Sequence, residues 1–243
     1  MAQSPPPVDR LSLDKSGRVI RDMFAGVAPR YDLLNRVLSG WLDEGWRRKS
    51  VAALGLSPGQ EALDLCCGTG DQARALTRRG LRVVAADFCL PMLAFARGKL
   101  PGREGLAPRL ASADAMSLPF ASGRFAGATV SFGLRNVADL DAALRELWRV
   151  LAPGGRLAVL EPTLPQNRLI RGPYVFYFTR ILPRIGALLS PRGSAYSYLP
   201  SSVLSFPERQ AFLDRLAEAG FERTEWRDLT AGTVCLYLGS KPR

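Results

Sequence analysis

Short apolar runs follow one another between residues 61 and 161, and stretches with helical periodicity separate them. The clearest runs are Glu61 to Leu65, Leu81 to Asp87 and Phe125 to Ser131. Strands of a parallel sheet have this composition, because helices cover both faces of the sheet and leave few positions in contact with water. The alternation therefore predicts βαβ units and an α/β fold with a parallel sheet.

The clearest predicted helix runs from Asp139 to Leu151, where apolar residues recur at helical spacing. Asp139 can cap its first turn, because a side-chain oxygen there can accept a free backbone N–H. Pro153-Gly154-Gly155 should end the helix and lead into a strand from Arg156 to Glu161.

The pattern near the C-terminus predicts one more helix and two strands. Ser205 to Glu208 has the spacing of a capping box, so the helix should begin there and end at Gly220. The strands should lie near residues 221–229 and 233–239 and complete the sheet.

Length and composition predict a single domain, because 243 residues with 47% hydrophobic content can bury one substantial core. Four segments make it up: a helical N-terminal cap (1–55) with breaks at Pro29 and around Gly40, a ligand-binding core (56–161), a helical insertion (162–206), and a C-terminal helix with strands (207–243).

The insertion interleaves aromatic residues with arginines. A helical lid that packs its aromatic side chains on the domain would explain this composition. A wall for a long apolar substrate, or a surface whose arginines meet lipid phosphates, would explain it equally well.

Gly68-Thr69-Gly70 follows the first apolar run and predicts a tight turn into a helix. Glycine lacks a Cβ, so the backbone can press against a ligand, and the helix N-terminus offers free N–H groups. Asp64 should fix this turn by accepting backbone N–H groups, or should bind an amine of the ligand. The turn alone is a weak signal, because several nucleotide-binding folds share it.

Polar residues follow the other strands at the same edge of the predicted sheet. Asp87 ends the second run, where a carboxylate can accept both hydroxyls of a ribose. Asp114-Ala115 ends a third run and Ser131 ends the fourth. This spacing fits a single nucleoside, bound at the carboxyl ends of the strands.

The chain contains no histidine, which removes the commonest general base and the commonest metal ligand. Its four cysteines form no Cys-x-x-Cys pair, so we expect them to be small buried residues and expect no metal site. Any proton transfer must therefore use carboxylates, tyrosine, or water held by amides and arginine.

The formal net charge is +11, and arginines spread along the whole chain account for most of it. Nucleic-acid binding, attraction to an anionic membrane and an arginine-rich proteome would each produce this charge; we favour the last. The longest apolar stretch, residues 174–189, is too short and too often interrupted to span a membrane. Residues 1–9 lack the apolar core of a signal peptide.

Three motifs in order carry a family resemblance. The glycine turn and strand-end residues resemble those of S-adenosylmethionine-dependent methyltransferases. Tyr31 to Trp46 and Arg149 to Thr163 resemble the two signatures of the quinone-biosynthesis C-methyltransferases, which methylate ubiquinone and menaquinone precursors. Ser131 to Asn136 is similar to the motif that follows strand four in that family. The resemblance extends from about Phe24 to Gly239.

The chain departs from the family pattern at a few positions. The family usually has methionine at the position of Leu34 and histidine at the positions of Asp43 and Tyr237. It usually has lysine at the position of Ala152 and serine at that of Thr163. The absence of both family histidines has two explanations. Chemistry in this protein does not need them, or the chain is a divergent paralogue with a shifted substrate. The first interpretation is favoured, because Tyr31, Asn35, Arg135 and Asn136 are all retained.

The resemblance implies a class I, Rossmann-like methyltransferase with a mostly parallel seven-stranded sheet, helices on both faces and a helical lid. The cofactor would be S-adenosyl-L-methionine. Its binding residues would be Asp64, Gly68, Thr69, Gly70, Asp87, Asp114, Ala115 and Ser131. Asp87 would bind the ribose, Asp114 and Ala115 the adenine, and the glycine turn with Ser131 the methionine moiety.

The resemblance also implies catalytic roles for Tyr31, Arg135 and Asn136. A quinol ring carbon becomes nucleophilic when a neighbouring hydroxyl loses its proton. Arg135 and Asn136 could stabilise the resulting phenolate and hold a water molecule. Tyr31 could orient the quinol or relay a proton.

The resemblance implies C-methylation of a prenylated quinol, most often demethylmenaquinol to menaquinol, because bacterial family members of this compact length commonly make menaquinone. Methylation of a benzoquinol in ubiquinone synthesis, a divergent small-molecule or RNA methyltransferase, and a non-catalytic scaffold stay open. Ser131 to Asn136 lacks the Asn-Pro-Pro-aromatic turn that holds a flipped base, so no specific nucleic-acid partner is expected. We expect a cytoplasmic protein that contacts the inner face of the membrane; a homodimer stays open.

Overall fold

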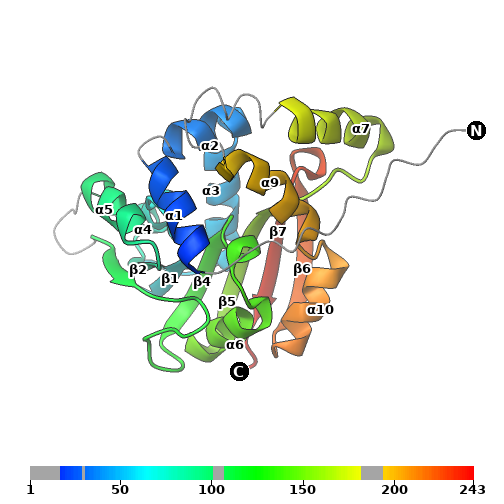
Figure 1. Ribbon diagram of the computed structural model, residues 1–243. Helices are drawn as coiled ribbons and strands as arrows, with labels where there is room; N and C mark the ends of the chain where they lie inside the picture. The colour runs from blue at the N-terminus through cyan, green and yellow to red at the C-terminus, as the bar shows by residue number, and fades with distance from the viewer. Residues whose placement is uncertain (1–16, 29–30, 101–106, 182–193) are drawn as a thin grey trace, which may run out of the picture.

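A seven-stranded sheet forms the centre of the protein in the computed structural model, which describes residues 17–28, 31–100, 107–181 and 194–243 (Figure 1). The strand order is β3-β2-β1-β4-β5-β7-β6, and β7 is antiparallel to both of its neighbours. The strands are β1 (Glu61–Leu65), β2 (Arg82–Asp87), β3 (Arg109–Ser112), β4 (Phe125–Ser131), β5 (Leu151–Pro162), β6 (Glu222–Leu229) and β7 (Val234–Ser240). The predicted α/β class and mostly parallel sheet are confirmed.

Helices cover both faces of the sheet because successive strand residues point to opposite sides. In β1, Leu63 and Leu65 pack in the cluster that contains α6 (Leu140–Val150) and α10 (Gln210–Glu218). Ala62 packs in the cluster on the other face, which contains α3 (Asp43–Leu54) and α4 (Asp71–Arg78). α5 (Leu90–Lys99) lies at the β2 and β3 side of the sheet, where Leu93 joins the second cluster.

A second group of helices gathers at the upper end of the sheet in Figure 1. These helices are α1 (Gly17–Val27), α2 (Tyr31–Ser39), α7 (Arg168–Phe176) and α9 (Ser194–Ser205). A π-helical turn, η3 (Tyr177–Ile181), continues α7. Phe178 and Val203 of the insertion form a small buried cluster against Leu38 of α2, so the insertion packs on the N-terminal cap.

The predicted helix after residue 139 is confirmed, since the Asp139 carboxylate accepts the N–H of Ala142 at 2.9 Å. The following strand begins earlier than predicted, at Leu151, and a register shift in its pairing with β4 accommodates the intervening Pro-Gly-Gly. In this turn the N–H of Gly154 donates to the carbonyl oxygens of residues 241 and 242.

The predicted capping box at Ser205 is wrong. Ser205 ends α9, where its hydroxyl donates to the carbonyl of Ser202, and Glu208 accepts the N–H of Leu164 instead. α10 begins at residue 210, and Arg209 precedes it with φ of 51° and no side-chain cap. The Arg209 N–H donates to the Tyr237 hydroxyl, so a contact distant in sequence replaces the local cap.

Candidate functional site

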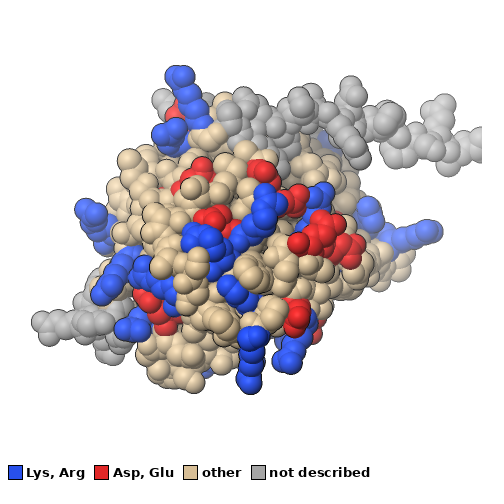
Figure 2. All heavy atoms as spheres, turned by 90° about the horizontal axis from the view of Figure 1, so that it is seen from below, with Lys and Arg blue, Asp and Glu red and all other residues tan. Residues whose placement is uncertain are grey.

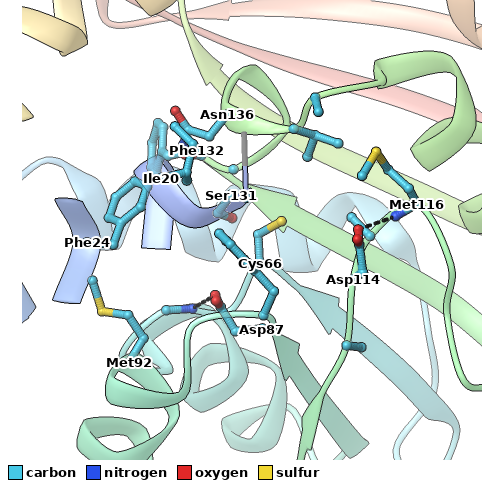
Figure 3. Close-up of a pocket in the computed structure, with 18 of the residues that line it drawn as sticks. Ile20, Phe24, Cys66, Asp87, Met92, Asp114, Met116, Ser131, Phe132 and Asn136 are labelled. Atoms are coloured by element: carbon cyan, nitrogen blue, oxygen red, sulfur yellow. Dashed lines mark hydrogen bonds between the residues drawn. The ribbon is translucent and has the colours of Figure 1, made fainter. Parts of the chain in front are cut away.

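A cavity lies where the carboxyl ends of β1, β2 and β4 meet the N-terminal helices; we call it the first cavity (Figure 3). Its lining includes Ile20, Phe24, Tyr31, Cys66, Gly68, Asp87, Phe88, Met92, Asp114, Ala115, Met116, Ser131, Phe132 and Asn136. Apolar side chains from α1 and α5 form one wall, and the strand ends supply most of the polar groups. Such a mixture suits a ligand with both a flat apolar part and several polar groups.

The turn after β1 has three residues with positive φ: Cys66 at 54°, Gly68 at 54° and Gly70 at 87°. The φ of Gly70 favours glycine, and a Cβ there would lie 2.7 Å from the Cδ1 of Leu100, so that side chain would have to move. Cys66 corrects one expectation, because it is partly exposed and lines the first cavity, whereas the other three cysteines are buried.

Asp87 connects the ends of two strands. One carboxylate oxygen accepts the N–H of Gly68 at 2.8 Å, and the other accepts the N–H of Cys89 at 2.9 Å. Burial raises the pKa of Asp87, although these backbone hydrogen bonds oppose the rise. Each oxygen keeps a second lone pair, so the carboxylate can still accept a hydroxyl of a ligand in the first cavity.

The remaining predicted cofactor residues divide into two groups. Asp114, Ala115 and Ser131 line the first cavity, and the Asp114 carboxylate accepts the N–H of Met116 at 2.9 Å. The Ser131 hydroxyl is buried without a hydrogen-bond partner among the described residues. A buried polar atom that lacks a partner fits a ligand that would supply one.

Asp64, Thr69 and Gly70 lie outside the lining of the first cavity. Asp64 is buried in β1 and accepts the hydroxyl of Thr129 at 2.9 Å. Burial raises its pKa to about 7, and the Thr129 hydroxyl is the main opposing influence. The Thr69 hydroxyl donates to Asp32 of α2.

A second cavity, of about 190 Å³, adjoins the first on the side of α2, α3 and the insertion. Its lining includes Tyr31, Asn35, Leu38, Ser39, Leu42, Asp43, Trp46, Arg47, Phe132, Arg135, Pro162, Tyr174, Phe178, Leu199, Thr230, Thr233 and Val234. Tyr31 and Phe132 line both cavities and therefore form the partition between them.

The three predicted catalytic residues meet at this partition. Tyr31 belongs to both linings, Arg135 to the second cavity and Asn136 to the first. Arg135 and Asn136 lie in the short 3₁₀ helix η2 (Leu134–Asn136), directly after β4. The Asn136 side-chain oxygen is buried without a partner among the described residues, as is the Nε of Arg135.

Glu161 holds the side chain of Arg135 in place. One Glu161 oxygen accepts a hydrogen bond from Nη1 of Arg135 at 2.9 Å, and the same Nη1 donates to the carbonyl oxygen of Phe132. The Glu161 side chain is fully buried, and burial raises its pKa although Arg135 opposes that rise. One edge of the guanidinium is thus held by the protein, and the Nε is left for another acceptor.

Sequence reasoning missed two side chains of the partition and its surroundings. Phe132 adopts φ of 63°, faces both cavities and stacks under the guanidinium of Arg47, 5.4 Å from its ring centre. Tyr198 of α9 has a buried hydroxyl that lacks a partner among the described residues. A positive φ at phenylalanine has no local sequence signal, and the position of α9 depends on tertiary packing.

Within the described part of the chain, no group of three or more His, Cys, Asp or Glu side chains could hold a metal ion. The search of those residues for a helix long and apolar enough to cross a membrane also found none.

The sheet order and the acidic residue that ends β2 define the fold of class I S-adenosyl-L-methionine-dependent methyltransferases. Solved structures share this fold. A methyltransferase in complex with the Haloferax volcanii Trm112 activator has a TM-score of 0.68 at 16% identity, covering 90% of this chain and 98% of that chain. The [4+2]-cyclase SpnF has a TM-score of 0.65 at 19% identity, covering 92% of this chain and 95% of its own.

The chain belongs to the ubiE/COQ5 methyltransferase family, whose model matches residues 12–241. A demethylmenaquinone methyltransferase of Deinococcus radiodurans is 44% identical over 99% of both chains. One of Thermus thermophilus is 48% identical over 90% of this chain and all of its own length. The chain is accordingly an S-adenosyl-L-methionine-dependent C-methyltransferase, and the predicted family is confirmed.

Proposed function

We propose that the protein transfers a methyl group to a ring carbon of demethylmenaquinol and that the reaction takes place at the partition between the two cavities. Relatives called demethylmenaquinone methyltransferase, 44% and 48% identical over most of the chain, support this substrate. The observation that carries the site assignment is that Tyr31 and Phe132 line both cavities, so ligands in the two would meet there.

The first cavity would hold S-adenosyl-L-methionine, which supplies an electrophilic methyl group. Asp87 would accept the ribose hydroxyls, and Asp114 with Ala115 would contact the adenine. Ser131, whose hydroxyl has no partner among the described residues, and Gly68 would contact the methionine moiety. Asp64, Thr69 and Gly70 would act on the cofactor indirectly, because they shape the turn without lining the cavity.

The second cavity would hold the quinol. Apolar and aromatic side chains of the cap and the insertion line it, including Leu38, Tyr174, Phe178 and Leu199. We assign the described residues of the insertion, 162–181 and 194–206, as a lid over this cavity, since its aromatic residues both pack on α2 and line the substrate space. Both interpretations of its composition, packing and substrate wall, then apply to the same residues.

Three residues would carry the chemistry. Arg135, with one edge held by Glu161, would stabilise the negative charge that develops on the quinol oxygen when it loses its proton. Asn136, whose amide oxygen has no partner in the described part of the chain, would hold the water molecule that accepts a proton. Tyr31 would orient the ring so that its carbon faces the methyl donor.

The test is methyl transfer from labelled S-adenosyl-L-methionine to reduced prenylated demethylmenaquinol, with the matching benzoquinol and bulk RNA in parallel reactions. Label on the naphthoquinol alone supports the proposal, and label on both quinols widens it to ubiquinone precursors. Label on RNA, or on no substrate while the cofactor still binds, would contradict it. RNA binding would also weaken steeply with salt.

We further propose that the protein is cytoplasmic and contacts the inner face of the membrane, where a prenyl tail resides. Large apolar side chains are exposed beside the second cavity, on α2 (Leu33 and Val37), in the turn after it (Trp41 and Leu42) and on α7 (Leu169 and Phe176). Arginines of the same helices, Arg36 and Arg171, could meet anionic headgroups.

A further inference from the structure

Lys99, the last residue of α5, joins three elements that are separate in sequence. Its ammonium nitrogen lies 2.6 Å from a carboxylate oxygen of Asp32 on α2 and 2.5 Å from one of Asp71 at the start of α4. It also lies 3.4 Å from the Thr69 hydroxyl, which itself donates to Asp32. We call these four residues the Lys99 clamp.

The clamp is partly buried, which distinguishes it from ordinary surface ion pairs. The side chains of Lys99 and Asp71 are 20% and 9% exposed, and that of Asp32 is 36% exposed. Burial alone would raise the pKa of Asp71, but the hydrogen bond from Lys99 and the charge of Arg47 bring it below its ordinary value. Ion pairs shielded from water are screened less by salt than exposed pairs are.

Asp32 is the residue through which α2 reaches the glycine turn. Among the described residues, the side chains of Arg36 and Ser39 on α2 contact Glu44 and Asp43 of α3. Tyr31, beside Asp32 in the sequence, lies close to the turn, with a ring carbon 3.8 Å from the place where a Cβ on Gly68 would be. The clamp therefore fixes the end of α2 that carries Tyr31.

We propose that Lys99 is a positioning residue: it holds the first turn of α2 against the glycine turn and so sets Tyr31 at the partition between the two cavities. Lys99 itself belongs to neither lining, so its effect on catalysis passes through Asp32 and Tyr31. The catalytic part of this proposal rests on the proposed function, whereas the structural part does not.

The first measurement is hydrogen exchange of the full-length, substrate-free protein. Lys99→Met should speed exchange of the amides of residues 31–39 and leave α3 unchanged. Arg97→Met is the matched control, because Arg97 is an exposed cation in the same last turn of α5. Lys99→Arg should restore slow exchange, since a guanidinium can still bridge two carboxylates. Unchanged exchange in Lys99→Met would overturn the proposal.

The second measurement is turnover together with cofactor affinity. Lys99→Met should lower kcat about tenfold, as misplacement of a reacting group does, with cofactor Kd nearly unchanged. Asp32→Asn should act similarly, and the double variant should be less than additive, because both changes break one ion pair. A loss of cofactor affinity equal to the loss of turnover would contradict positioning and indicate direct cofactor contact.

The two measurements separate the clamp from the proposed function. Wild-type protein that fails to methylate the naphthoquinol, while Lys99→Met still speeds exchange in α2, would refute the substrate and leave the clamp in place. Active wild-type protein with normal turnover in Lys99→Met would refute the positioning role alone.

Discussion

Three buried carboxylates in the strands near the site differ in the groups that donate hydrogen bonds to them. Glu161 faces the guanidinium of Arg135, and Asp87 accepts two backbone N–H groups. Asp64 accepts chiefly the neutral hydroxyl of Thr129. Burial raises the pKa of all three against the opposition of these partners, and the pKa of Asp64 reaches about 7.

Asp64 should make the stability of the cofactor-free protein depend on pH. Its pKa rises from 3.8 when unfolded to about 7 when folded, so its favourable contribution is complete below pH 3.8 and is lost as the pH rises through 7. The difference in unfolding free energy between Asp64→Asn and wild type should therefore grow in favour of the variant from acid pH to pH 8, by on the order of 4 kcal/mol. Urea unfolding at several pH values measures it, and a difference independent of pH would contradict the assignment.

The Glu161–Arg135 pair should show the cost of an uncompensated buried charge. Glu161→Gln leaves the guanidinium without its counter-charge, so unfolding free energy should fall by about 3–5 kcal/mol. The double variant with Arg135→Gln should be more stable than this single variant, because neither charge remains. Denaturant titrations of wild type, both single variants and the double variant test it, and an additive loss in the double variant would argue against the pair.

Asp87 should matter most for the cofactor. Asp87→Ala removes the acceptor of two backbone N–H groups and of the proposed ribose hydroxyls, so affinity should fall by about 1.5–3 kcal/mol per lost charged hydrogen bond. Asp87→Asn keeps one acceptor oxygen and should lose less cofactor affinity. Calorimetric titration with S-adenosyl-L-methionine gives the values, and unchanged affinity in Asp87→Ala would refute the ribose placement.

At the scale of elements, the turn after β1 and the start of η2 press together. A Cβ on Gly133 would overlap the Cβ of Cys66 and lie 2.9 Å from its sulfur. Both segments carry residues of the first cavity, so their contact sets the floor of the site.

Gly133→Ala should destabilise the protein by about 1–3 kcal/mol, as overpacking does, and weaken cofactor binding. Cys66→Gly in the same chain should restore both properties, because it removes the overlapping atoms and relieves the positive φ of residue 66. The test measures the unfolding free energy and the cofactor affinity of the single and double variants. A double variant with the same two values as Gly133→Ala would show that the crowding lies elsewhere.

At the scale of the whole molecule, charge and exposed apolar surface are distributed differently. Lys and Arg are mixed with Asp and Glu over the face seen in Figure 2, which matches a general excess of arginine better than a single polyanion site. The exposed apolar side chains beside the second cavity, by contrast, belong to α2, the turn after it and α7, which flank the cavity.

Binding to anionic vesicles should therefore depend on that region. Leu169→Ser with Phe176→Ser on α7 should reduce co-sedimentation at low salt, since both side chains are strongly exposed. Leu90→Ser with Phe95→Ser on α5 is the matched control, because these are also exposed and lie on another part of the molecule. Equal losses in both pairs, or wild-type protein that stays in the supernatant, would refute the membrane contact.

Local sequence determined the elements and the order of polar residues at the sheet edge. The glycine turn, Asp87, Asp114 and Ser131 could be placed because parallel strands bring their carboxyl ends to one side. The Asp139 cap could be predicted because its hydrogen bond is made within three residues. The family could be identified because its motifs are contiguous in the chain.

Tertiary structure alone decided which of these residues face a cavity. Ser205 looks like a cap, yet α10 begins after Arg209, whose N–H is satisfied by Tyr237 from a distant strand. Thr69 looks like a ligand contact, yet its hydroxyl donates to Asp32. Long-range hydrogen bonds and packing compete with local preferences, and a sequence pattern records only the local side of that competition.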